Sequence, residues 1–118
     1  MLFASALGIH NGFGQCFINQ TESTIFTNAT VIYQTFTACS TGDLDQVNLF
    51  VNIVDYDATI EIFEGASLDA GDLLESKSFT DLESVRVNGS TVAAIFDVGD
   101  LDISVTSGSV YTFRVTSN

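Results

Sequence analysis

The chain of 118 residues contains no proline and only three basic residues, Lys77, Arg86 and Arg114, against fifteen Asp and Glu. Its net charge is −12. Nucleic-acid binding requires several basic side chains to neutralise phosphates, and so does attachment to an anionic membrane surface. The composition therefore excludes nucleic acid as a partner. An acidic surface of this kind suits solubility, salty surroundings or the capture of cations.

The sequence also lacks the apolar run of roughly 18 residues that a membrane-spanning helix requires, so membrane insertion is not expected. Hydrophobic residues nevertheless make up 46% of the chain, and ten of them are Phe. This content and length suit a single folded domain with one core.

Catalytic groups are scarce. His10 is the only histidine, and nucleophilic catalysis needs a base beside the nucleophile. The glycines at positions 12 and 14 are too close together to cradle a phosphate, and no helix is expected after them. Pairs of acidic residues are too common for any one of them to indicate a glycosidase. We therefore do not expect an enzyme.

Cys16 and Cys39 are the only cysteines, and neither belongs to a CxxC motif. A disulfide between them would pin the N-terminal segment to a later strand and stabilise the fold by roughly 3–4 kcal/mol in the chain-entropy description. Two separate buried thiols are the alternative. The pair is a disulfide candidate that the sequence alone does not decide.

From Thr30 onwards apolar and polar residues alternate, as in Ala58–Glu64 and Val110–Thr116. A period of two places successive side chains on opposite faces of a strand. Turn residues separate the runs, and Asn88-Gly89 is the strongest hairpin signal. We predict an all-β fold, an antiparallel two-sheet β-sandwich of eight or nine strands, jelly-roll or immunoglobulin-like.

The expected strands in this part of the chain are Val31–Ala38, Gln46–Val54, Ala58–Glu64, Leu73–Phe79, Val85–Val87, Thr91–Val98, Leu101–Val105 and Val110–Thr116.

Residues 1–29 differ from the sandwich domain expected over 30–118, because the first dozen residues are apolar and carry no acid. We expect residues 1–29 to combine a docking arm with short strands. The arm would dock on its own sheet or on a neighbouring chain through an interface formed by Leu2, Phe3, Leu7 and Ile9.

Three stretches resemble one known domain type: Gln34–Gly42; Ala58–Gly65 with Gly71–Leu74; and Ser104–Thr116. The chain is similar over residues 34–116 to the β-sandwich modules of large bacterial secreted and cell-surface, adhesin-like proteins. The resemblance implies a structural, adhesive or glycan-binding role and an extracellular location. It brings no catalytic motif.

Acidic residues cluster at two predicted turns. Calcium prefers oxygen ligands from carboxylates and loop carbonyls. The first candidate site comprises Asp97, Asp100 and Asp102, and the second comprises Asp55 and Asp57. Capping and Asx-turn roles are the alternative for both groups. Calcium is the only cofactor considered.

Aromatic residues at outward positions provide the last candidate site. Phe50 and Phe63 fall on the polar phase of their strands and would form an exposed pair. Tyr33 and Tyr56 are further candidates for stacking on a sugar. An exposed apolar patch marks an interface, although local cover on both sheet faces would also explain the pattern.

Two functions remain. The first is a non-enzymatic structural or adhesive subunit that forms a homo-oligomer, binds a scaffold protein or decorates a filament, virion or cell surface. The second is a carbohydrate-binding module of a secreted protein, with or without the assistance of calcium.

Overall fold

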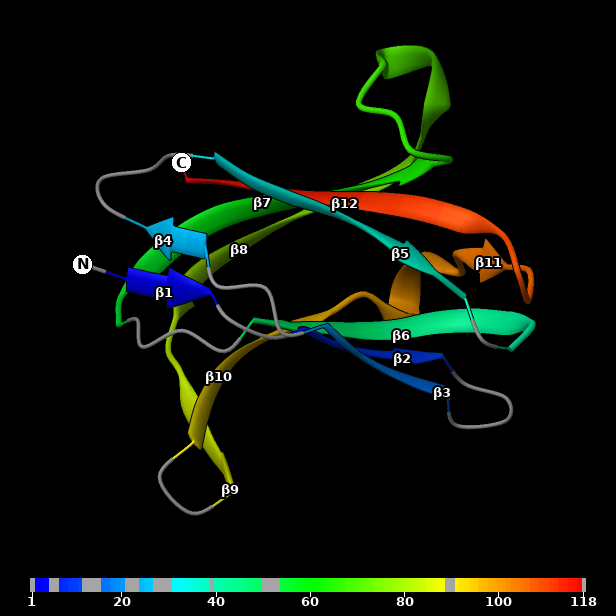
Figure 1. Cartoon of the computed structure of the whole chain (residues 1–118). Coiled ribbons are helices and arrows are strands. Elements are labelled where there is room, and N and C mark those ends of the chain that lie inside the picture. Colours follow the sequence, from blue (N-terminus) through cyan, green and yellow to red (C-terminus); the bar gives the residue numbers. More distant parts are fainter. Residues whose placement is uncertain are drawn as a thin grey trace.

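The computed structural model describes residues 2–4, 7–11, 16–20, 24–26, 31–38, 40–49, 54–88 and 91–117, and for the strands before residue 31 it describes the backbone. Twelve strands and two short 3-10 helices are described. The all-β two-sheet sandwich predicted from the alternating pattern is confirmed. Figure 1 shows the two sheets as separate layers.

One layer is a sheet of six strands. In chain order these are β2 (Leu7–Asn11), β3 (Cys16–Gln20), β6 (Gly42–Leu49), β9 (Val85–Asn88), β10 (Thr91–Asp97) and β11 (Ser104–Val105). Their spatial order is β3-β2-β6-β10-β9, and β11 pairs with the start of β6. The pairing within this layer is antiparallel.

The other layer is a sheet of four antiparallel strands in the order β5-β12-β7-β8. Their bounds are β5 (Val31–Thr37), β7 (Tyr56–Glu64), β8 (Leu73–Leu82) and β12 (Val110–Ser117). A separate two-stranded ribbon pairs β1 (Leu2–Ala4) with β4 (Thr24–Phe26). The 3-10 helices are η1 (Ala70–Asp72) and η2 (Gly99–Leu101).

The core lies between the two sheets and follows the period-two pattern. Inward residues of the four-stranded sheet meet inward residues of β6 and β10. The ring of Phe79 on β8 contacts that of Phe96 on β10 edge to face, with 5.3 Å between centroids. The largest fully buried core side chains are Phe36, Phe96, Phe113, Leu44, Ile60, Ile62, Val47, Val98, Val105 and Val115.

Several predicted elements need correction. The strand predicted over 101–105 is in fact the end of η2 followed by the two-residue β11. Asp102 between them has a φ of 54°, which a β-strand does not accommodate. The strand predicted to begin at Gln46 begins at Gly42, and the loop predicted over 65–72 contains η1. Residues 50–53 of the predicted strand 46–54 lie outside the described residues.

The N-terminal segment enters the sandwich itself. β2 pairs with β6 on one side and with β3 on the other, so its backbone is an internal strand of the six-stranded sheet. Docking on its own sheet is therefore the arrangement that the structure shows for β2. The predicted boundary between residues 29 and 30 falls in the connection from β4 to β5.

Candidate functional site

The acidic turn after β10 is held by a lysine from the opposite sheet. The Nζ atom of Lys77 on β8 lies 2.9 Å from the carbonyl oxygen of Asp97 and 2.9 Å from Oδ1 of Asp100. The Gly99 N–H donates to Oδ1 of Asp97 at 3.1 Å, as in an Asx-turn. The hydrogen bond from Lys77 holds the pKa of the Asp100 carboxyl below its ordinary value. The turn is thereby connected to the other layer.

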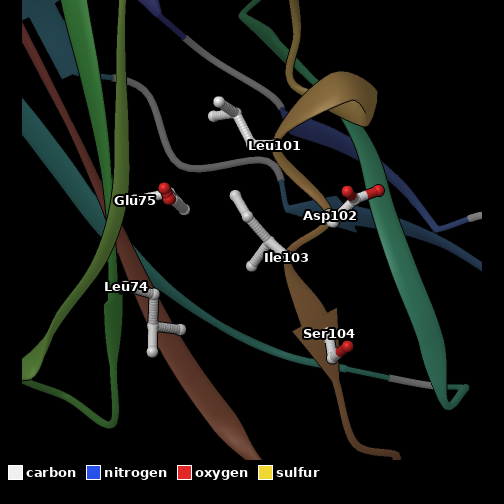
Figure 2. A pocket seen from close by; sticks show the side chains of 6 residues that line it. All are labelled: Leu74, Glu75, Leu101, Asp102, Ile103 and Ser104. Atoms are coloured by element: carbon white, nitrogen blue, oxygen red, sulfur yellow. The ribbon is translucent and has the colours of Figure 1, made fainter.

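This geometry bears on the predicted calcium site. The ammonium of Lys77 already binds two of the oxygens that a cation at Asp97 and Asp100 would use. Asp102 lies outside this contact, and in Figure 2 its side chain points away from β8. Among the described residues, no three His, Cys, Asp or Glu side chains are grouped to hold a metal. Calcium binding at this turn stays a prediction, and a bound calcium ion would have to displace the ammonium of Lys77.

The second acidic pair is at the turn before β7. Oδ1 of Asp57 accepts the backbone N–H of Asp81 at 2.9 Å, which connects the start of β7 to the end of β8. Asp55 in the turn has a φ of 52°, and Asp81, near the end of β8 where the pairing with β7 shifts register, has a φ of 55°, so both occupy the left-handed region. Asp57 therefore holds two paired strands together where their register shifts.

Beside the Lys77 contact a cleft of about 350 Å³ opens between the layers. In Figure 2 the side chains of Glu75 on β8 and Ile103 point toward each other across this space. Ile103 is buried, whereas Leu74 at the mouth is 38% exposed. The cleft is lined by Leu74, Glu75, Leu101, Asp102, Ile103 and Ser104. Since Asp102 points away from Glu75, the two carboxylates do not face a common ligand position.

The outer face of the four-stranded sheet is a further candidate contact surface. Val31 and Tyr33 on β5 are 44% and 62% exposed. A shallow hollow of about 490 Å³ lies beside them on the same face, lined by Val31, Thr59, Glu61, Arg114 and Thr116. Strand register places Tyr33 directly opposite Arg114, and Arg114 directly opposite Glu61.

An ion pair forms one wall of this hollow. Nε of Arg114 donates to Oε1 of Glu61 at 2.8 Å, and this bond raises the pKa of the guanidinium above its ordinary value. Among the described residues this is the one hydrogen bond of the guanidinium, which has five N–H donors. The pair is charge-balanced, although the chain as a whole is strongly acidic.

The expectation of an exposed Phe63 is wrong. Phe63 is only 1% exposed. It lies on the outer face of β7, but the guanidinium of Arg114 stacks over its ring, with Cζ 5.0 Å from the centroid. Thr112, opposite Phe63 in the β12–β7 register, accepts the Ser67 N–H at 3.3 Å and donates to the Gly65 carbonyl at 2.7 Å.

These bonds tie the segment after β7 down at the place where Phe63 lies. In Figure 1 this segment stands above the four-stranded sheet, on the side away from the other sheet. Phe63 is therefore covered on the outer face of the sheet. This agrees with the alternative explanation of the pattern, in which the sheet is locally covered on both faces. The sequence signal for this burial is that two apolar residues, Ile62 and Phe63, follow each other. A strand that is buried on both faces has consecutive apolar residues instead of an alternating pattern.

The remaining candidate residues are only partly described. Phe50 and Cys39 lie outside the described residues, so the exposed aromatic pair and the disulfide have no description here. Cys16 is in β3, and Leu2 and Phe3 are in β1, with Leu7 and Ile9 in β2. Tyr56, the other aromatic candidate, is half-buried. Of the aromatic candidates whose side chains are described, Tyr33 is the exposed one.

The chain matches no protein-family model, and no significant similarity to a curated protein or to a solved structure is found. Within the described residues no helix has the length and apolar character needed to cross a membrane.

Proposed function

We propose that this chain is a non-enzymatic structural or adhesive module that acts by contact through the outer face of its four-stranded sheet. The observation that carries the proposal is the exposure of Tyr33 and Val31 on an ordered sheet face, beside a hollow walled by a charge-balanced Arg114–Glu61 pair. Large exposed apolar side chains gathered on one face are typical of interaction surfaces.

A strand-borne surface suits contact because the backbone ladder already holds its side chains in place. Arg114 is further restrained by Glu61 and by the ring of Phe63. Little conformational entropy is then lost when a partner binds, which favours affinity from a modest area. Self-assembly, or attachment to a filament, virion or cell surface, would use such a preorganised face.

A carbohydrate-binding module is the second candidate, and the polar lining of the same hollow favours it. Thr116, Glu61 and Arg114 offer hydroxyl, carboxylate and guanidinium groups for sugar hydroxyls. Tyr33 offers an exposed ring for stacking on a sugar face. Calcium would assist from the acidic turns if it displaces Lys77.

The test uses the full chain in two parallel measurements. Light scattering after size exclusion gives its mass from micromolar to near-millimolar concentration, and a glycan array with calcium or with chelator tests saccharide retention. Tyr33→Ala is the test variant. Val54→Ala is the matched control, because Val54 is 66% exposed in the turn before β7 and belongs neither to β5 nor to the lining of the hollow.

Self-association that Tyr33→Ala weakens, without glycan retention, supports the structural module. Glycan retention that Tyr33→Ala removes and Val54→Ala leaves intact supports the second candidate. Hydrolysis of a retained glycan would contradict a non-enzymatic role. A chain that neither associates nor binds any surface overturns both candidates.

A further inference from the structure

The two edges of the four-stranded sheet are built differently. β8, at one edge, carries Glu75 and Lys77 at positions that pair with the inward residues Ile62 and Ile60 of β7. Inward-pointing charges on an edge strand discourage another strand from adding to it. The ammonium of Lys77 is also engaged by the turn after β10. Strand addition at β8 is therefore disfavoured.

β5, at the other edge, has no such protection. Its sequence VIYQTFT contains no charged residue and no proline, and six of its seven residues are β-branched or aromatic. Among the described strands it pairs with β12 alone. A long, uncharged edge of high β-propensity is a template for pairing with another chain.

The neighbouring hydrogen bonds identify which backbone groups of β5 point away from β12. The Ala38 N–H donates to the Ser109 carbonyl at 3.0 Å, and the Ala38 carbonyl accepts the Gly108 N–H at 2.8 Å. Both groups of Ala38 therefore point toward the β12 side. Because antiparallel bonding alternates along a strand, the N–H and C=O groups of the odd-numbered residues point away from β12. These residues are Val31, Tyr33, Thr35 and Thr37, and their side chains are exposed as well.

We propose that β5 pairs antiparallel with β5 of a second copy of this chain, about a two-fold axis at Gln34, so that two four-stranded sheets become one continuous sheet. This inference rests on the proposed function, since it names the partner in self-assembly. In this register Val31 lies opposite Thr37 of the partner subunit, and Tyr33 opposite Thr35 of the partner subunit. The four odd-numbered residues of each β5 then form hydrogen-bonded pairs, which gives about eight backbone hydrogen bonds.

A second copy suits β5 better than another class of partner. A two-fold interface needs one surface to complement itself, and the odd-numbered residues do so as aromatic or β-branched cross-strand pairs. A strongly basic partner would find no charge on β5 itself, and the nearest charged residue in register, Arg114, is already paired with Glu61. The lack of charge on β5 also keeps acidic groups of the two copies out of the joined strands, although each chain carries −12.

The edge strands of the six-stranded sheet are less suited to pairing with a second copy. β9 contains Arg86, and β3, although uncharged, spans five residues against seven in β5. Fewer paired residues give fewer interstrand hydrogen bonds. β5 is therefore the edge that we assign to self-pairing.

The test compares two substitutions at one position in the full chain. Thr35→Pro removes an N–H that points to the free edge and leaves the ladder to β12 intact, whereas Thr35→Val keeps the N–H and the β-propensity. We expect the native chain and Thr35→Val to reach twice the monomer mass of 12.6 kDa in light scattering. Thr35→Pro should dissociate at about hundredfold higher concentration, with an unchanged circular dichroism spectrum.

Hydrogen exchange on the native chain gives a second measurement that does not depend on the folding of a variant. The amides of Tyr33 and Thr35 should exchange more slowly as protein concentration rises. Those of Ile32 and Gln34, which face β12 in this register, should be protected at every concentration.

Exchange at Tyr33 and Thr35 that does not depend on concentration, or a dimer that Thr35→Pro does not weaken, overturns the β5 assignment. That result would leave the proposed function, which is contact through the outer face of the sheet, untouched. A native chain that is monomeric at every concentration also overturns the inference, and the proposed function is then judged by surface and glycan retention alone.

Discussion

At the scale of single residues, six aspartates of this chain have a local structural role. Asp55, Asp81 and Asp102 all have φ between 52° and 55°, a region that Asp and Asn occupy at lower cost than most L-residues. Asp57 and Asp97 accept backbone N–H groups, and Asp100 accepts Lys77. The acidic turns predicted as calcium sites thus have a local conformational role in the structure.

Asp102 provides a test of the conformational role. Asp102→Asn should change the free energy of unfolding by less than about 0.5 kcal/mol, because Asn also tolerates the left-handed region. Asp102→Val should lower it by about 1–2 kcal/mol, because a β-branched side chain at positive φ meets the backbone. Urea denaturation measures both.

Ser104→Val is the control for this pair, since Ser104 is exposed in β11 and should accept valine with little loss. If Asp102→Val and Asp102→Asn lower the free energy of unfolding equally, the left-handed backbone conformation is not the cause of the lower stability.

The contact between Asp100 and Lys77 predicts how the stability of the fold depends on pH. Its folded-state pKa is lowered by the hydrogen bond from Lys77, so the folded state favours the ionised carboxylate. The contribution is fully present above the unfolded pKa of about 3.9 and is lost as pH falls through the lower folded pKa. The melting temperature of the native chain should therefore exceed that of Asp100→Asn at neutral pH, and the difference should shrink below about pH 4.

A gap between the two melting temperatures that stays constant from neutral pH into the acid range would contradict this role for the ionised carboxylate. Lys77→Met should close the gap at all pH values, because it removes the group that distinguishes the two protonation states.

At the scale of elements, a buried hydroxyl helps attach the connection from β7 to β8 to the sheet, beside the hydrogen bond from the Gly65 N–H to the Val110 carbonyl at 2.8 Å. Thr112 is 1% exposed and is the buried polar residue of the described core. Its Oγ1 bonds to both the Gly65 carbonyl and the Ser67 N–H. Within the connection, Oγ of Ser67 donates to Oδ2 of Asp72 at 2.6 Å, which holds η1 to the same segment. The connection thereby keeps Phe63 covered.

We therefore expect Thr112→Val to lower the free energy of unfolding by about 1–3 kcal/mol, because the replacement keeps the volume but leaves two backbone groups without their partner. The connection should also become more accessible to protease at residues 65–72. Thr116→Val on the same strand and face, where the side chain is half-buried, should cost less than about 0.5 kcal/mol. Similar losses for both variants would show that the Thr112 hydrogen bonds do not anchor the connection.

At the scale of the whole molecule, charge is the dominant feature. Of the three basic side chains, Lys77 and Arg114 each pair with one acidic group, and the net charge remains −12. Like charges repel in the compact state, and salt screens that repulsion over a Debye length of about 8–10 Å near physiological ionic strength. The fold is expected to be more stable in salt than without it.

The melting temperature should thus rise when sodium chloride is raised from low to molar concentration at neutral pH, and most of the rise should come early, while the Debye length is still long. Potassium chloride should act equally, since the effect is screening. A melting temperature that falls with salt would mean that the few ion pairs outweigh the repulsion. A rise specific to calcium would instead support the acidic turns as a metal site.

The sequence by itself determined the all-β class, because period-two alternation is a local property of each strand and holds whichever strand pairs with which. It also located the β9–β10 hairpin, but not its register: Asn88 pairs with Thr91, whereas a two-residue Asn88-Gly89 turn would pair residues 87 and 90. Register and layering were decided only by the tertiary structure. Arg114 and Glu61 are 53 residues apart, and Lys77 and Asp100 are 23 apart.

No local pattern shows that these pairs meet. Phe63 therefore appears exposed from its strand phase and is buried in fact, and the acidic turn appears open to a cation while Lys77 binds it. The same reason separates the two sheet edges. A strand's sequence reveals whether it carries charge, but only the assembled sheet shows that β5 and β8 are the strands left at its ends.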